Sequence, residues 1–131
     1  MMNDQLDKEL KPLKDVLCEL RNGGKILVAV LYGSYANGTP HKRSDIDLAV
    51  FIKARDEKEE MDIIDKILTS TERQIALLRL NDEDESPFVI QDALKGIHLV
   101  TADEDTLYEV AHRVLHSAEE IRFRRLLSGT E

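Results

Sequence analysis

Continuous apolar runs separated by polar segments are the clearest pattern along the chain. The run at residues 25–32 has no polar alternation, which predicts a strand buried on both faces in the middle of a sheet. A second apolar run occupies residues 46–52, and we expect further strands at 74–80 and 97–100. These four runs predict a small sheet.

Between the runs, apolar residues recur at helical spacing. Residues 5–22 form one such segment, in which Pro12 indicates either a helix start near Lys11 or a kink between two pieces. Further helices are expected at 56–70, from Ser86-Pro87 to Gly96, and at about 103–127. The last has an apolar stripe that we expect to cover the sheet: Leu107, Val110, Ala111, Val114, Leu115, Ala118 and Ile121. The pattern predicts an α/β (α+β) fold with a small mixed sheet of three to five strands, in a single domain over 1–131.

Composition narrows the classes of partner. A formal net charge of −8 argues against extended nucleic-acid binding, which needs clustered Lys and Arg. Cys18 is the only cysteine and lies among apolar helix positions, so we expect a reduced intracellular protein. With no leader-like start and no apolar run near the length of a membrane span, we expect a cytoplasmic protein with no membrane contact.

Candidate chemistry begins at Asp45-Ile46-Asp47. A strand sends alternate side chains to opposite faces, so both carboxylates are expected on one side while Ile46 enters the core. Two like charges beside an apolar run need relief by a cation or solvent. Mg²⁺ suits such a pair, because it binds through one or two carboxylates together with substrate phosphates.

Gly33-Ser34 follows the first apolar run directly. A glycine permits a sharp turn and close approach to a ligand, and Ser34 is expected to cap a short helix over 35–37. Amide groups at such a helix start would bind phosphate. Lys42 and Arg43, with His41, make a positive cluster in the following loop, which is either a phosphate contact or a solvated loop tip.

Together the two halves form a longer signature. Gly33-Ser34-Tyr35-Ala36-x-Gly38 and Ser44-Asp45-Ile46-Asp47-Leu48-Ala49-Val50, with ten residues between Ser34 and Asp45, resemble the DNA polymerase beta-like nucleotidyltransferase superfamily, and within it the minimal nucleotidyltransferase (MNT-domain) family. The resemblance implies that Ser34 contacts nucleotide phosphate and that Asp45 and Asp47 ligate Mg²⁺. It further implies ATP or another nucleoside triphosphate as donor. A helical HEPN-type protein is implied as partner, with an antitoxin role in which AMP is transferred to a tyrosine.

One position departs from the family. Its third strand carries a third acid, and aligning on Leu80-Asn81 puts Ala76 there. Glu72 shares its parity but lies about 13 Å away along a strand. An acid of the loop at residues 81–85 could also reach in, although we expect that loop to be a solvated turn. Because a general base is worth on the order of 10² to 10⁴ in rate, a slow or inactive transferase is an alternative: a protein that neutralises a helical partner by contact. A third possibility is a homodimeric nucleotide sensor.

Two further clusters are expected to be structural. His112 and His116 lie four residues apart on the last predicted helix, but no other ligand accompanies them, so we expect a solvated or packed pair. Basic residues at the end of this helix, Arg122, Arg124 and Arg125, are expected to form an ordinary helix end, with a partner surface or nucleotide phosphate as the alternatives.

Overall fold

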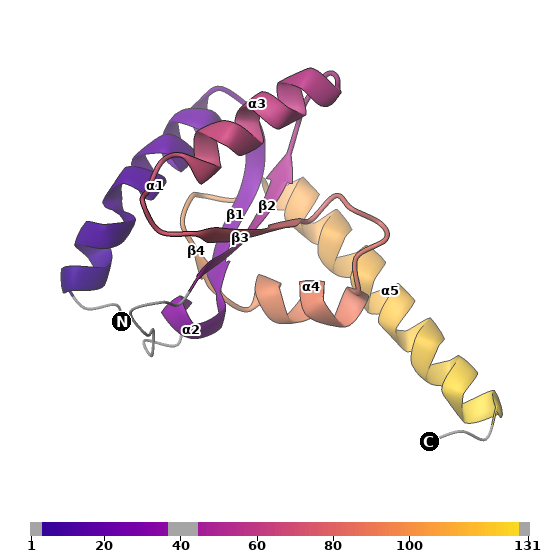
Figure 1. The fold of residues 1–131 in the computed structure, drawn as a ribbon. Coiled ribbons are helices and arrows are strands. Elements are labelled where there is room, and N and C mark those ends of the chain that lie inside the picture. The colour runs from indigo at the N-terminus through magenta and orange to yellow at the C-terminus, as the bar shows by residue number, and fades with distance from the viewer. Residues whose placement is uncertain (1–3, 37–44, 129–131) are drawn as a thin grey trace.

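A computed structural model describes residues 4–36 and 45–128 (Figure 1). The helices are α1 (Asp4–Asn22), α2 (Gly33–Ala36), α3 (Glu57–Leu68), α4 (Pro87–Leu94) and α5 (Glu104–Ser128). The strands are β1 (Ile26–Tyr32), β2 (Ile46–Ile52), β3 (Ile75–Arg79) and β4 (Ile97–His98). All four apolar runs therefore form strands, although the last is shorter than the expected 97–100.

The strands form one mixed sheet in the order β3-β2-β1-β4. Strand β1 pairs with β2 and with β4 in antiparallel fashion, whereas β2 and β3 are parallel. The most apolar strands, β1 and β2, thus occupy the centre, where both faces of a strand are covered. This arrangement confirms the predicted α+β fold with a small mixed sheet.

Helices cover both faces of the sheet (Figure 1). On one face, leucines of α1 and isoleucines of α3 pack against Leu31, Leu48 and Val50. On the other face, α4 and α5 pack against the alternate residues, including Val30 and Ala49. The period-2 alternation of β1 and β2 therefore sends one set of side chains to each layer.

Helix α1 is continuous through Pro12, so neither a start near Lys11 nor a break is observed. Pro12 itself is exposed, while Leu10 and Leu13 on either side of it are fully buried. We attribute the continuity to this burial, which offsets the hydrogen bond that proline cannot donate. The helix ends as predicted: Gly24 has a φ of 72°, and the Lys25 amide donates to the Leu20 carbonyl at 2.9 Å.

Two helix starts differ in detail from the prediction. Helix α2 begins at Gly33, so Ser34 lies inside the helix instead of capping it. Ser86 does occupy the N-cap of α4, ahead of Pro87, but its side chain makes no cap hydrogen bond. Asp56 caps α3, accepting a hydrogen bond from the Glu59 amide at 2.8 Å.

The stripe on α5 is narrower than predicted. Val110, Val114 and Ala118 are buried, but Ala111 and Leu115 are exposed. Since Ala118 lies further along α5 and is buried, the sheet and α4 cover only a narrow arc of the helix. The C-terminal part of α5 extends beyond them (Figure 1). Cys18 is also exposed and not, as predicted, among the apolar positions of its helix.

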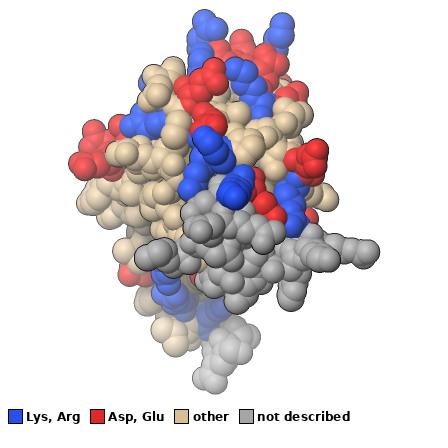
Figure 2. Space-filling model, turned by 90° about the vertical axis from the view of Figure 1, so that its left-hand side faces the viewer, with Lys and Arg blue, Asp and Glu red and all other residues tan. Residues whose placement is uncertain are grey.

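Lys and Arg side chains alternate with Asp and Glu over the face drawn in Figure 2, so the charges there do not form a field of one sign. Among the described helices, none combines the length and apolarity that crossing a membrane requires.

Candidate functional site

The register of the sheet aligns three residues at one end of the strands. Tyr32 of β1 pairs with Asp47 of β2, and Asp47 pairs in turn with Ala76 of β3. Ala49 lies two residues after Asp47 in β2, and Leu78 lies two residues after Ala76 in β3. Both belong to the core beneath α4 and α5, so the row lies on that face of the sheet. The end of the sheet that follows the first apolar run is therefore a platform with Asp47 at its centre.

Asp47 lies on this face, and Asp45 is near enough for its charge to act on Asp47. Asp45 lies just before β2 and is exposed, whereas Asp47 is half-buried. Burial raises the pKa of Asp47, and the nearby negative charge of Asp45 raises it further. Ile46, between them, is fully buried on the opposite face. The start of β2 therefore brings two carboxylates near each other, and a cation would relieve their repulsion.

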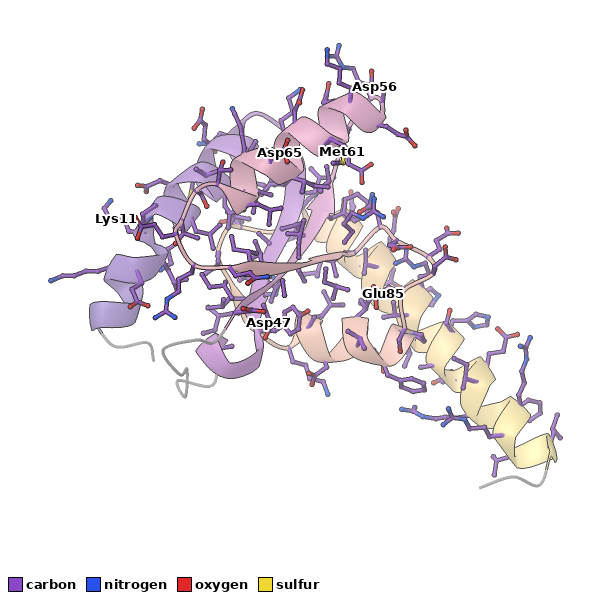
Figure 3. All side chains as sticks on the ribbon, viewed as in Figure 1. Lys11, Asp47, Asp56, Met61, Asp65 and Glu85 are labelled. Atoms are coloured by element: carbon purple, nitrogen blue, oxygen red, sulfur yellow. The ribbon has the colours of Figure 1, made fainter. Side chains whose placement is uncertain are left out.

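Gly33 makes the closest approach to this pair. It has a φ of 72°, and a Cβ built on it would lie 2.2 Å from Asp47 Oδ2. No other residue type combines that backbone conformation with that closeness. Helix α2 begins at this point and packs against both β1 and β2 (Figure 3). The turn that was predicted to bind phosphate is thus in contact with the carboxylate that was predicted to bind metal.

The other candidates are placed less completely. Ser34 lies in α2, one residue from the contact, but its side chain falls outside the described residues. Lys42, Arg43 and His41 also lie outside the described residues. The part these side chains play therefore stays a prediction.

Tyr32 was not singled out from the sequence. Its pKa is raised by burial and then by the negative charges of Asp47, Glu85 and Asp92, so the phenol remains a proton donor beside carboxylates. The last two acids belong to the loop before α4 and to α4 itself. One signal could have pointed to Tyr32: it is the last residue of the strand that leads into Gly33.

Gly96 allows the turn after α4 to approach β1. A Cβ at this position would lie 2.1 Å from the Leu31 carbonyl oxygen and 3.1 Å from the Tyr32 Cβ. Glycine is therefore needed here for closeness and not for its φ. The contact helps to place α4 beside the platform, since α4 packs against β1 and β2.

Comparison of the sequence with models of known protein families assigns the chain to a family. The family described as "Polymerase beta, Nucleotidyltransferase" matches residues 14–105, which is more than half of the sequence. The chain belongs to this nucleotidyltransferase family. The match includes the whole of α2, β1, β2 and β3, and so the complete platform. No curated protein matches the chain significantly in sequence.

Solved structures similar to this nucleotidyltransferase domain agree on the fold. A chain of a toxin–antitoxin structure with AMP-PNP superimposes with a TM-score of 0.65 at 20% identity, covering 87% of this chain and 93% of the other. A chain from the complex of tri-AMPylated Shewanella oneidensis HEPN toxin with MNT antitoxin gives 0.60 at 17% identity, covering 91% and 93%. A chain of the toxin–antitoxin MntA-HepT gives 0.59 at 17%, covering 89% and 92%.

The donor set of the platform fits a hard divalent cation. Asp45 and Asp47 offer carboxylate oxygens near each other, and a bound positive charge would counteract the rise in the pKa of Asp47. Within the part of the chain that the structure describes, no three His, Cys, Asp or Glu side chains converge as a metal cluster. A metal held by the two aspartates would therefore need further ligands from phosphate or water.

The remaining candidates do not join the platform. His112 and His116 are both exposed, and His112 stacks on Tyr108 with ring centroids 5.8 Å apart, as expected for a solvated pair. Arg124 pairs with Glu120 at 2.7 Å, and Arg122 lies over the Phe88 ring. Figure 1 places this end of α5 far from α2. This arginine cluster therefore lies away from the platform.

Proposed function

We propose that this nucleotidyltransferase domain transfers AMP from ATP to a hydroxyl group of a helical HEPN-type protein, and that it acts as the antitoxin of such a pair. The observation that carries the proposal is the contact between Gly33 and Asp47, with the charge of Asp45 acting on Asp47. This contact unites a backbone turn suited to phosphate with a pair of acids suited to Mg²⁺. The toxin–antitoxin structures of similar fold suggest the acceptor.

Each part of the platform has a distinct task in this reaction. Asp45 and Asp47 would hold Mg²⁺, which when bound neutralises charge on the transferring phosphate. The amides at the start of α2, with Ser34, would orient the outgoing phosphates. The acceptor oxygen then bonds to the α-phosphorus while the bond to pyrophosphate breaks, so AMP is transferred and pyrophosphate leaves.

The acceptor must also lose its proton. Ala76 is the β3 neighbour of Asp47, and its methyl group can neither accept a proton nor bind a metal. Glu72 lies before β3 begins at Ile75. The proton would therefore pass to water. We expect transfer to be slow relative to a member of the family with an acid at this position.

The same alanine supports a second candidate function. A domain that binds nucleotide but turns it over poorly could neutralise a helical partner by contact alone. Neutralisation would then require no covalent change, and the platform would be a remnant or a nucleotide sensor.

A transfer assay separates the two functions. The chain is co-expressed with its genomic neighbour, and the purified pair is incubated with ATP labelled at the α-phosphate. AMP transfer predicts label on the partner, its loss in Asp47→Asn, and its retention in Asp65→Asn. Asp65 is an exposed aspartate on α3, across the sheet from the platform, and controls for the loss of one charge (Figure 3).

The transfer proposal would be overturned if Asp47→Asn still neutralised the partner and if neither wild type nor Asp47→Asn placed label on it. That outcome would instead support neutralisation by contact.

A further inference from the structure

The outer face of α5 carries a second, regularly spaced row of residues. The row, with alternating spacings of four and three, is Tyr108, His112, Leu115, Glu119, Arg122 and Leu126. Every member is exposed. The spacing is that of the contact positions in a coiled coil, and it runs on the side of α5 away from the buried Val110, Val114 and Ala118.

Two large apolar side chains in this row are left in solvent. Leu115 is 46% exposed and Leu126 is 77% exposed, and Phe123 at the edge of the row is 60% exposed. In a helix that already buries its other face, this apolar surface contributes nothing to the domain's own core. It therefore favours a helical partner.

Two charged residues, Glu119 and Arg122, lie between the leucines and lack ion-pair partners among the described residues. Among the described residues, neither Glu119 nor Arg122 has an ion-pair partner within the chain, in contrast to the neighbouring Glu120 and Arg124. Arg122 instead lies over the Phe88 ring, 5.3 Å from its centroid. A cation–π contact uses none of the guanidinium N–H groups as hydrogen-bond donors to an anion, so they can still bind a carboxylate.

The order of these four residues is complementary to itself when reversed. In an antiparallel pair of α5 helices, the register that places Glu119 opposite Arg122 of the partner copy also places Leu115 opposite Leu126 of the partner copy. The two-fold axis repeats both contacts. A parallel pair would instead oppose Glu119 to Glu119, which is unfavourable.

We infer that the chain forms a two-fold symmetric homodimer through antiparallel pairing of its α5 helices along Leu115, Glu119, Arg122 and Leu126. Two ion pairs are enclosed by two leucine pairs, a pattern that fixes both register and direction. Figure 1 shows this part of α5 projecting away from α2, so the dimer leaves the platform accessible. The inference does not depend on the proposed function.

The dimer is expected to be weak. The contact from residue 115 to 126 is only about 17 Å long at 1.5 Å per residue, so it buries less surface than a standard protein–protein interface. Its ion pairs lie at a solvent-exposed face and are screened by salt. Dimerisation should therefore depend on concentration and decline as ionic strength rises.

Sedimentation velocity of the full chain, over a concentration series at low and high salt, tests the inference. Wild type should shift from monomer to dimer with concentration. Glu119→Arg and Arg122→Glu each oppose like charges at two places and should weaken association at least tenfold. The double variant Glu119→Arg/Arg122→Glu restores opposite charges and should dimerise like wild type.

Mixing the two single variants gives the sharpest result. A Glu119→Arg chain offers only arginines and an Arg122→Glu chain only glutamates, so together they should form a heterodimer although neither self-associates. Glu109→Arg, the same charge change on α5 outside the contact, should leave the wild-type dimer intact. Circular dichroism confirms that each variant is folded.

A wild-type chain that stays monomeric into the hundreds of micromolar at low salt would overturn the inference. So would single variants that dimerise as well as wild type. Loss of binding to a helical partner in Leu115→Glu, with wild type monomeric alone, would assign the same face to that partner instead.

Discussion

The two strands on either side of Asp47 differ sharply. On the β1 side, Tyr32 pairs with Asp47, and Gly33 comes so close that an added Cβ would have to displace the Asp47 carboxylate. On the β3 side, the neighbour is Ala76, whose small and exposed side chain has no carboxylate. The side that would bind nucleotide is closely packed, whereas the side that would supply a third acid is open.

In the proposed function, binding and turnover are separable. Binding would use the two aspartates and the turn at Gly33, and the structure brings Gly33 and Asp47 together. Rapid turnover needs a proton acceptor as well. We therefore expect Mg²⁺-dependent ATP binding to be robust and transfer to be slow.

The largest effect is expected from removing the centre of the platform. Asp47→Asn should weaken Mg²⁺-dependent ATP binding by more than about 100-fold. Loss of a direct metal ligand should reduce affinity more than loss of a residue that only orients such a ligand. Isothermal titration calorimetry with ATP and Mg²⁺ measures this, with Asp65→Asn as the matched control. Equal binding by Asp47→Asn and wild type would contradict the assignment of the metal site.

Restoring an acid on the open side should have the next largest effect. Ala76→Asp is expected to raise the rate of AMP transfer about 100-fold, at the lower end of what a general base contributes. Ala76 is exposed, so the new carboxylate can remain hydrated.

Ala76→Asn has the same shape without the charge and is the control. If it increased transfer as much as Ala76→Asp does, proton acceptance or metal ligation could not be the missing contribution.

A glycine pair tests the closely packed side. Gly33 and Gly24 share a φ of 72°, but a Cβ at Gly24 would meet nothing within 4 Å. Both substitutions by alanine should cost about 1–2 kcal/mol of stability through backbone strain. Only Gly33→Ala should also displace the Asp47 carboxylate, and we expect it to weaken ATP binding about tenfold, or about 1.4 kcal/mol.

Chemical denaturation and calorimetry on both variants separate strain from site disruption. Similar ATP affinities for Gly24→Ala and Gly33→Ala would show that the contact with Asp47 is unimportant for binding.

The smallest effect concerns pH. Because the pKa of Asp47 is raised above 3.8, its ionised form destabilises the folded state, and this cost disappears as pH falls through the raised pKa. Without metal, Asp47→Asn should therefore have a slightly higher Tm than wild type at neutral pH. The difference should vanish in acid.

Thermal unfolding followed by circular dichroism from pH 4 to 7 gives this comparison. Adding Mg²⁺ and ATP should reverse the order at neutral pH, because only wild type would bind them and gain stability. A constant difference at all pH values would show that ionisation of Asp47 is not its source.

Much of the fold follows from the sequence, because long apolar runs have few alternatives to a central strand. The placement of Asp47 on the face opposite the buried Ile46 follows equally from the two-residue period of a strand. The contact of Gly33 with Asp47 could be expected only in outline. It depends on a strand register and on a positive φ that no local pattern specifies.

Other features depend on tertiary packing that periodicity does not encode. Pro12 remains inside α1 because leucines on both sides of it are buried. Leu115 fits the apolar stripe of α5 by spacing, yet it faces outward because the sheet and α4 cover only a narrower arc. The environment of Tyr32 depends on α4, which is more than fifty residues away in sequence.

A crystal structure of the chain with Mg²⁺ and a non-hydrolysable ATP analogue tests the central claim most directly. We predict a metal ion between Asp45, Asp47 and the phosphates, with the phosphate chain against the amides at the start of α2. A nucleotide bound elsewhere, or one bound at α2 with no metal on the two aspartates, would contradict the account.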